Sequence, residues 1–345
     1  MAGIIAPNVA GRREMLLEML FLADRRQTVA TSMLRKPKSS NNEKTGISNS
    51  QIGTYFAKVL GDLKPGGVRD GADVKAFDSN PNREPISFRP EKYRRAPMVG
   101  DLARGDDIAG VSDAGSDEWE EALSTQMILH KRDIEKEILS EQDSSVGGGA
   151  EGGTTMRGFG RWINAGELAF SELPVPQGAA TPAAQIYTGI LGDGITTGLT
   201  EDVVSGLLQA RWDATGDSGQ LVGLLGTAIK NRFGFFSKYK ANVTNATVII
   251  RTQAKDYDSN ELDSPSIDVY NSDWGSFSLI PVSTLYLPDA KTGYFLDMSQ
   301  CELRSRYWMR EKPLPDLGGG PRELIESFVA LIPGDLRSHV KIHAT

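Results

Sequence analysis

The sequence predicts an α+β fold, with helices preceding an antiparallel run of strands in its C-terminal half. Two patterns lead to this prediction: an amphipathic helix pattern over residues 116–142 and short strand patterns that recur from residue 266 onward. Composition agrees, because apolar side chains make up 39% of the 345 residues and glycine raises the share to that of ordinary globular proteins. The chain can therefore bury a core, and wholesale disorder is excluded.

The first 42 residues form an N-terminal arm. Residues 12–26 have the apolar spacing of a short helix, and a basic and then polar segment follows them. Residues 1–40 carry seven basic and three acidic side chains, although the whole chain has a net charge of −7. The body is therefore acidic, which argues against a dedicated nucleic-acid-binding domain. An arm with an apolar helix needs a surface to dock on, either its own body or a neighbour.

The arm does not have the pattern of a targeting signal. The Arg12-Arg13 pair precedes an apolar run that is short, contains Glu18 and ends in charged residues where a cleavage site needs small ones. No stretch approaches the roughly 18 uncharged apolar residues of a membrane span. We therefore expect no membrane association.

Residues 43–115 are an unusual excursion. Their charges are dense and balanced, and apolar residues are scattered among five prolines. Strand patterns over residues 53–60 and 86–98, separated by turn-rich sequence, predict an extended two-stranded hairpin. An excursion with so little apolar content cannot form its own core. It has to lie on another surface or stay mobile.

The clearest element is the helix predicted over residues 116–142. An acidic first turn favours its start, and the apolar side chains that follow at steps of three and four form one face: Trp119, Leu123, Met127, His130, Ile134 and Ile138. Its length, about 40 Å, is unusual for a globular domain. The opposite, charged face is interpreted as a solvated or inter-subunit face.

The C-terminal half contains a regular series of elements. A glycine run at residues 147–153 predicts a flexible linker, and Thr200 begins a second helix that carries an acidic first turn. An apolar segment at residues 221–225 and a helix over 228–240 come next. Strands are then predicted at residues 248–250, 266–270, 275–285, 293–298, 323–332 and 339–342.

Patterns for catalysis are weak. Gly147–Gly153 has neither a following lysine–serine/threonine pair nor a preceding strand, both of which a phosphate loop needs. Gly216-Asp217-Ser218-Gly219 resembles the nucleophile strip of serine proteases, but the one histidine before it, His130, lies mid-helix. We interpret this strip as a turn and expect His130 to be a partly buried helix residue.

Metal and thiol chemistry are equally unsupported. Residues 256–260 resemble the start of a calcium loop, but Glu261 replaces its glycine and Ile267 its final glutamate. Cys301, beside Glu302, lacks the positive surroundings of a reactive thiolate and is expected to be a buried small residue. We predict no catalytic residue, no cofactor and no metal, so that the chain is not an enzyme.

Several segments resemble one family of major capsid proteins of tailed bacteriophages. Residues 130–139 (His-Lys-Arg-Asp-Ile-Glu-Lys-Glu-Ile-Leu) are similar to its long-helix segment, and residues 158–163 (Gly-Phe-Gly-Arg-Trp-Ile) to the segment that follows. Residues 267–277 resemble its step of strand, serine, aromatic residue and glycine. Its closing region resembles residues 296–303, 311–313 and 323–329. The similarity covers roughly residues 116–345, whereas the arm and hairpin match by position and composition only.

This resemblance implies the Hong Kong 97-type capsid fold and a division of the chain. It implies an N-terminal arm (1–42), an extended loop over a neighbouring subunit (43–115), a peripheral domain with a spine helix (116–164), an axial domain around five- and six-fold axes (165–322) and a return to the peripheral domain (323–345). Some members of the fold crosslink a loop lysine to a neighbour's asparagine. Lys58, Lys64 and Lys75 are candidates here, but nothing marks one as reactive, so this chemistry is not carried over.

The implied function is that of a major capsid protein, which assembles as pentamers and hexamers into an icosahedral head around the phage genome. Implied partners are other copies of the chain, portal and scaffolding proteins, a cement protein in some heads, and packaged DNA through non-specific contacts, with no membrane. The implied location is the virion, with assembly in the host cytoplasm. We expect assembly contacts at Leu16, Leu20, Phe21, Tyr55, Phe56, Phe88, Tyr93, Arg132, Glu135 and Trp274.

Physical reasoning on the residues leads to the same class of protein. A hairpin that cannot bury itself, an amphipathic arm and an overlong helix all need partner surface, which subunits in a closed symmetric shell supply. The alternatives are another self-assembling virion protein (a minor capsid, vertex or tail protein), a surface-layer protein that exchanges arms, or a hydrolase that uses Ser218.

Overall fold

The computed structural model describes residues 26–36, 47, 52–58, 60, 66–73, 77, 83–100, 118–165, 173–194, 196–217, 221–236, 269–315 and 319–345. Two compact units are each built from separate stretches of chain. The smaller unit comprises Met1–Gln27, Arg94–His130 and Met309–Glu326, and the larger comprises Thr28–Tyr93, Lys131–Trp308 and Ser327–Thr345. The predicted strand at 248–250, the calcium-like loop at 256–260, Ser218 and most of the predicted helix at 12–26 lie outside the described residues.

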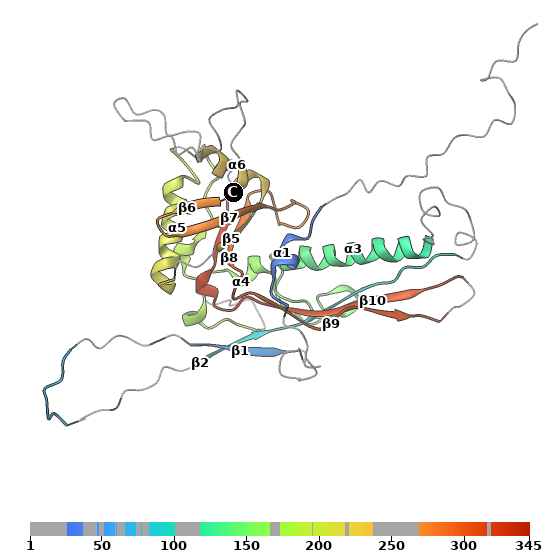
Figure 1. Ribbon diagram of the computed structural model, residues 1–345, viewed down its shortest axis with the longest axis horizontal. Coiled ribbons are helices and arrows are strands. Elements are labelled where there is room, and N and C mark those ends of the chain that lie inside the picture. The colour runs from blue at the N-terminus through green and yellow to red at the C-terminus, as the bar shows by residue number, and fades with distance from the viewer. Residues whose placement is uncertain are drawn as a thin grey trace, which may run out of the picture. The chain divides into compact units, whose positions relative to one another are not determined.

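The described elements mix helices and strands, as an α+β fold requires (Figure 1). The helices are α1 (Val29–Met33), α3 (Glu118–Ile138), α4 (Phe159–Trp162), α5 (Glu201–Thr215) and α6 (Thr227–Phe236). The strands are β1 (Gly53–Lys58), β2 (Arg83–Phe88), β3 (Glu91–Arg95), β4 (Ile186–Tyr187), β5 (Leu221–Leu225), β6 (Val269–Ser272), β7 (Gly275–Pro281), β8 (Thr292–Asp297), β9 (Glu302–Pro313), β10 (Glu323–Ile332) and β11 (Val340–His343).

A six-stranded sheet in the larger unit has the order β4-β11-β8-β5-β7-β6. β5 runs parallel to β7 and antiparallel to β8, and β6 and β7 form an antiparallel pair. Figure 1 shows α5 and α6 packed beside this sheet. Phe233 of α6 is buried, and its ring lies 5.4 Å from that of Tyr270 and 5.9 Å from that of Phe295, measured between centroids. The aromatic cluster joins α6 to strands that are far apart in sequence.

The caps of α5 explain where it ends and why it begins where the sequence predicts. The Thr200 hydroxyl accepts a hydrogen bond from the Val203 N–H at 3.4 Å, and Glu201 and Asp202 occupy the first turn. Gly216 ends the helix with φ of 67°, a left-handed conformation that glycine adopts without steric cost. Gly216, the first glycine of the segment that resembles a protease nucleophile strip, is therefore the C-cap of α5.

A second core in the larger unit gathers residues from the C-terminal half of α3, from α4 and from β10. Ile134, Ile138, Phe159, Trp162 and Val329 are each at most 1% exposed there. The predicted apolar face of α3 is thus buried at its C-terminal end. His130 is buried more fully than predicted, at 0% exposure.

The smaller unit contains the N-terminal part of α3, up to His130. It also contains the end of β3 (residues 94–95), the end of β9 (309–313) and the start of β10 (323–326). Glu326 is buried, and its carboxylate forms ion pairs with Arg310 and Lys312, with N···O distances of 2.9 Å and 3.1 Å. The side chain of Arg95 on β3 donates to that of Gln126 on α3 at 3.2 Å. These contacts join strands and helix inside this unit.

Three differences from the sequence-based prediction have physical causes. The strand predicted over 86–98 is divided at Pro90, which lacks the N–H that a ladder needs. β9 was not among the predicted strands, because the charged side chains along it hide any apolar alternation. The glycine run at 147–153 belongs to a closed loop rather than a linker, since Ser145 and Thr155 pair across its base with an N–H···O distance of 3.0 Å.

Candidate assembly surfaces

The hairpin of β1 and β2 presents one face to the chain's own core. In its antiparallel register Tyr55 lies opposite Ile86, and Ile86 and Phe88 are buried in the second core. The Tyr55 hydroxyl donates to the Gly334 carbonyl at 3.2 Å, and burial raises the pKa of this phenol. The surface on which the base of the hairpin lies is therefore the chain's own core.

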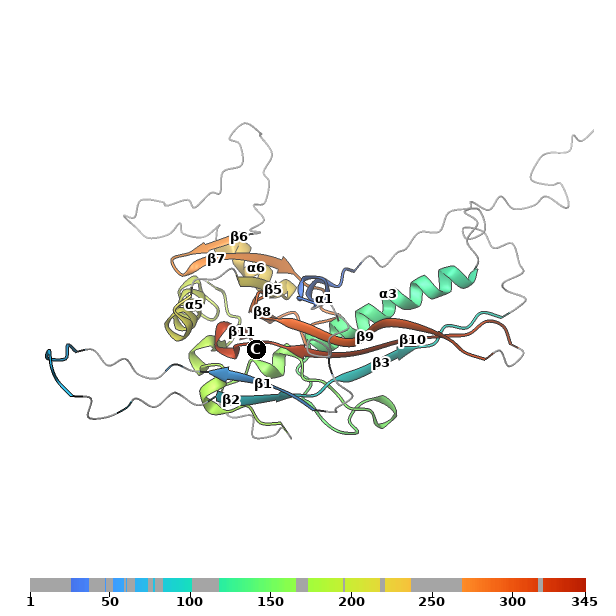
Figure 2. The same cartoon turned by 60° about the horizontal axis from the view of Figure 1, so that its bottom comes forward.

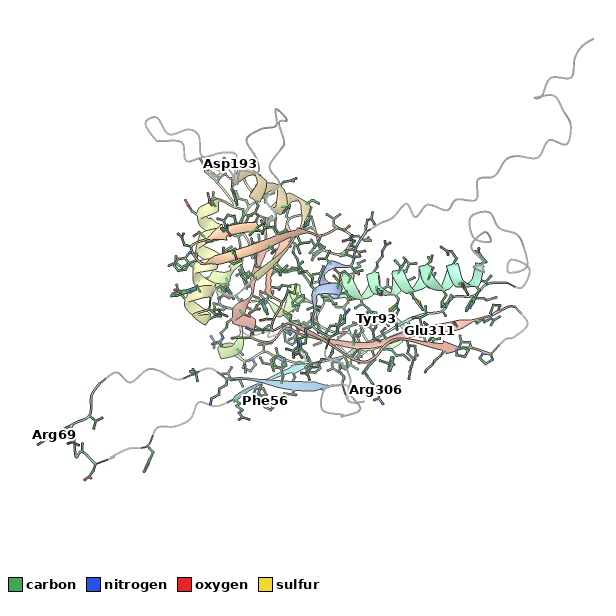
Figure 3. All side chains as sticks on the ribbon, viewed as in Figure 1. Phe56, Arg69, Tyr93, Asp193, Arg306 and Glu311 are labelled. Carbon is green, nitrogen blue, oxygen red and sulfur yellow. The ribbon has the colours of Figure 1, made fainter. Side chains whose placement is uncertain are left out.

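The other face of the hairpin is open and partly apolar. Phe56 is 63% exposed and lies opposite Pro85, which is also exposed. Figure 3 shows the Phe56 side chain directed away from the body of the larger unit. Farther along the same excursion, Leu60 and Val68 are each 81% exposed and Phe77 is 93% exposed. We call Phe56, Leu60, Val68, Phe77 and Pro85 the outer hairpin surface.

The N-terminal segment is anchored to α3 by one buried carboxylate. Glu135 is 0% exposed and accepts hydrogen bonds from the N–H groups of Ala30 at 2.7 Å and Thr31 at 2.6 Å, and from the Thr31 hydroxyl at 2.5 Å. These N–H groups are in the first turn of α1, where no helical acceptor exists, and the N-cap residue Thr28 makes no side-chain cap. Glu135 therefore caps α1 from another element.

Further contacts hold the residues that follow α1. The Leu303 N–H donates to the Arg35 carbonyl at 3.0 Å, and the Lys36 ammonium lies 4.7 Å from the centre of the Trp308 ring. Residues 29–36 are thus fixed to α3 and β9 within the larger unit.

A half-buried acidic cluster lies where β3 leaves the hairpin. Glu91 accepts a hydrogen bond from the Met156 N–H at 2.9 Å and one from the Gln142 amide at 3.4 Å. Burial raises the pKa of Glu91 to about 7, and the nearby Glu137 carboxylate adds to this shift, while the hydrogen bonds from Met156, Tyr93 and Gln142 oppose it. Burial and Asp133 likewise raise the pKa of Glu137. The base of the hairpin therefore holds a group that titrates near neutral pH.

This cluster predicts a measurable pH dependence. A carboxyl whose folded pKa is raised from 4.5 to about 7 stabilises the fold fully below pH 4.5, and that stability is lost as pH rises to 7, by about 3 kcal/mol. In Glu91→Gln the amide oxygen can still accept from Met156 without titrating. We expect the variant to exceed the stability of the natural chain by no more than about 1 kcal/mol at pH 5 and by about 3 kcal/mol at pH 8, measured by urea unfolding.

The matched control for this prediction is Glu120→Gln, at an exposed position of α3. It should leave the stability difference between pH 5 and pH 8 as it is in the natural chain. If Glu91→Gln behaved like this control, the titration would have to belong to other groups.

The predicted contact residues fall into four classes. Leu16, Leu20 and Phe21 lie outside the described residues. Phe88 and Glu135 are buried by contacts within the chain, and Phe56 is exposed. The half-buried residues are Tyr55, Tyr93, Arg132 and Trp274, of which Trp274 lies beside the 40%-exposed Trp212. A role of each in assembly stays a prediction, and sequence reasoning missed Pro85 and Trp212, which the strand register and the ring contact reveal.

Two further side chains that could carry chemistry, Cys301 and His339, lie inside the fold. Cys301 is buried, and burial raises the pKa of its thiol, so the reactive thiolate is disfavoured. His339 is also buried: its Nε2 donates to the Pro333 carbonyl at 2.8 Å and its Nδ1 accepts from the Asp297 N–H at 3.2 Å. In the described part of the chain, no cluster of three metal-ligating side chains occurs, and no helix is long and apolar enough to span a membrane.

Comparison with known proteins identifies the class of this architecture. The sequence profile of the SU10 major capsid protein family matches residues 7–343. The chain belongs to this family. It is a major capsid protein of the kind that forms the icosahedral shell of a bacteriophage, which decides against a minor capsid, vertex or tail protein. The family consists of structural virion proteins. No curated protein matches the sequence.

Solved structures share the fold of this major capsid protein along its whole length. The capsid of a native GTA particle, computed with C5 symmetry, has a TM-score of 0.59 at 10% identity and covers 100% of both chains. The capsid of cyanophage A-1(L) has a TM-score of 0.58 at 14% identity, with 96% of each chain covered. For Microbacterium phage Oxtober96 the values are 0.53 and 13%, with 97% of this chain and 96% of that chain covered. The Hong Kong 97-type fold expected from the sequence is confirmed.

Proposed function

We propose that copies of this capsid protein assemble as pentamers and hexamers, and that the hairpin of each copy covers a neighbour. The outer hairpin surface carries this proposal: three of its members are more than 80% exposed, although the same hairpin is anchored at its base. Burying large apolar side chains of this kind against a partner contributes roughly 1.5–3 kcal/mol each. The anchored base holds the hairpin, and the open face supplies the contact.

The proposal includes the division of labour that the resemblance implies. Residues 165–322 would surround the five- and six-fold axes, residues 116–164 and 323–345 would form the periphery of each capsomer, and residues 1–42 and 43–115 would reach other copies. Portal, scaffolding and, in some heads, cement proteins would complete the particle. Packaged DNA would meet the inner surface through non-specific contacts only, and assembly would take place in the host cytoplasm without catalysis by this chain.

Electron microscopy of the expressed protein tests the proposal. Expressed alone or with its genomic neighbours, the chain should form closed shells or capsomers in which five-fold vertices are visible in class averages. A monodisperse monomer under all conditions would contradict it. Labelling of Ser218 by a broad serine-reactive probe, lost on denaturation, would contradict the absence of catalysis.

A further inference from the structure

The open face of the hairpin carries three residue pairs of different chemistry. The antiparallel register of β1 and β2 sets the members of each pair directly opposite one another. From the body toward the loop the pairs are polar, apolar and cationic: Thr54 with Ser87, Phe56 with Pro85, and Lys58 with Arg83. The hydroxyls of the polar pair share a hydrogen bond at 3.1 Å. The cationic pair therefore ends the two-stranded ribbon where the loop begins.

The cationic pair has no counter-charge on the ribbon. Lys58 and Arg83 are both exposed, and residues directly opposite in an antiparallel pair have Cβ atoms about 4.5–5.5 Å apart, where like charges destabilise the pairing. Among the described residues, neither side chain has a carboxylate partner. The one acidic residue of the two strands, Glu84, is on the inner face, where its charge adds to that of Asp335 in raising the pKa of Arg337. The ribbon thus holds two cations that repel each other and that its own strands do not neutralise.

Two features favour a protein surface over DNA as the partner of this face. Phosphates would neutralise the cationic pair, but they would leave Phe56, which is 63% exposed, and the exposed Pro85 against a polar backbone. Residues 116–345 carry 31 acidic and 20 basic side chains, a net charge of −11. The body of a second copy therefore offers carboxylates to the cations, together with the apolar surface that folded proteins expose.

The ribbon lies where a second copy can reach it. Figures 1 and 2 show β1 and β2 along one border of the larger unit, on the side away from α5 and α6. We propose that Lys58 and Arg83 of one copy bind carboxylates on the body of a second copy, while Phe56 and Pro85 pack against apolar side chains beside them. This inference rests on the proposed function, in which the hairpin reaches a neighbour, and it names the chemistry of the surface that the hairpin meets.

A charge reversal separates this role from a structural one, because it should move stability and assembly in opposite directions. Lys58→Glu replaces the cross-strand repulsion by an ion pair with Arg83, so amide exchange in β1 and β2 of the free subunit should slow by about twofold to fivefold. The same change sets a carboxylate against carboxylates in the contact, so the protein concentration for half-maximal assembly should rise about tenfold, measured by light scattering. A slower exchange without a loss of assembly would overturn the proposal.

Two further variants serve as controls. Lys136→Glu makes the same change of charge at an exposed position of α3, and it should leave exchange and assembly within about a factor of two of the natural chain. Lys58→Glu combined with Arg83→Glu restores a like-charge pair, now acidic, so exchange should return to about the natural rate while assembly becomes weaker than for Lys58→Glu alone. A double variant that forms shells as readily as the natural chain would contradict a carboxylate partner.

Crosslinking in assembled shells identifies the partner. A carbodiimide joins a lysine amine to a carboxylate that it contacts, so shells assembled from equal amounts of isotope-labelled and unlabelled chains are treated with it and digested. We expect crosslinked peptides in which Lys58 of one copy is joined to an aspartate or glutamate within residues 116–345 of another, recognised by mass as mixed-label pairs. The absence of mixed-label links to Lys58 would overturn the proposal.

The outcomes also separate this contact from the proposed function. Absence of shells from the natural chain would count against the proposed function itself, whereas natural shells whose assembly is unaffected by Lys58→Glu would overturn this contact alone. Weaker binding of a short DNA duplex by Lys58→Glu subunits, with assembly unchanged, would assign the cationic pair to packaged DNA and likewise overturn the proposal.

Discussion

Replacing residues 60–81 by a four-residue glycine–serine turn is expected to abolish shell formation and to leave a folded subunit. The replacement removes Leu60, Val68 and Phe77, three exposed apolar side chains of the outer hairpin surface. It keeps β1 and β2 in their register, so that Ile86 and Phe88 stay in the core. The thermal unfolding midpoint should change little, because the described residues that are removed are exposed.

The effect on assembly should be large. If the three side chains contribute only half of the roughly 1.5–3 kcal/mol expected for full burial of each, the loss is about 2–4 kcal/mol per subunit. Each 1.4 kcal/mol is a factor of ten, so the concentration for half-maximal assembly should rise at least thirtyfold. Light scattering during assembly, followed by microscopy of the product, measures this.

A second variant separates the side chains from the length of the loop. Residues 60–81 replaced by glycine and serine at equal length keep the reach of the loop but not its apolar groups. We expect this variant to fail as the short one does. If it formed normal shells, the loop would act as a spacer and the outer hairpin surface would not be the contact.

The sequence predicted the secondary structure and its buried faces best where a single local pattern determines them. The spacing of Ile134 and Ile138 predicts the buried face of α3, and Thr200 with its acidic first turn predicts the start of α5. Alternation likewise predicts that Tyr55 and Phe56 point to opposite faces of the hairpin. Which of the two faces is covered could not be predicted, because the answer depends on Gly334, 279 residues away in the chain.

Contacts between distant segments limited the prediction of the site. Glu135 lies on the charged side of a helix pattern, where a solvated or inter-subunit role is the natural expectation, yet its partners Ala30 and Thr31 bury it within the chain. The same limit applies to the Trp212–Trp274 pair, since α5 and the β6–β7 turn are separated by a long stretch of sequence. Trp274 was expected to be an assembly contact, but only the fold brings its ring beside that of Trp212.

Glu135→Ala is expected to release the segment that joins the arm to the body. The substitution leaves the N–H groups of Ala30 and Thr31 and the Thr31 hydroxyl without their acceptor, in a place where Ala30 and Thr31 are buried. Orphaned buried donors cost about 1–3 kcal/mol each when water cannot reach them. We therefore expect a loss of about 3 kcal/mol in the free energy of unfolding, and hydrogen exchange in residues 29–36 that is at least tenfold faster.

The controls decide whether this loss is specific to the cap. Lys136→Ala changes the next, exposed residue of α3 and should leave both exchange and stability unchanged. Glu135→Gln keeps one oxygen acceptor and should fall between the natural chain and Glu135→Ala, because one α1 N–H can still be satisfied. Since residues 29–36 belong to the segment predicted to reach other copies, Glu135→Ala subunits should also form fewer closed shells even when they are folded. Unchanged exchange in residues 29–36 would show that α1 is held by its other contacts, such as those of Arg35 and Lys36 with β9.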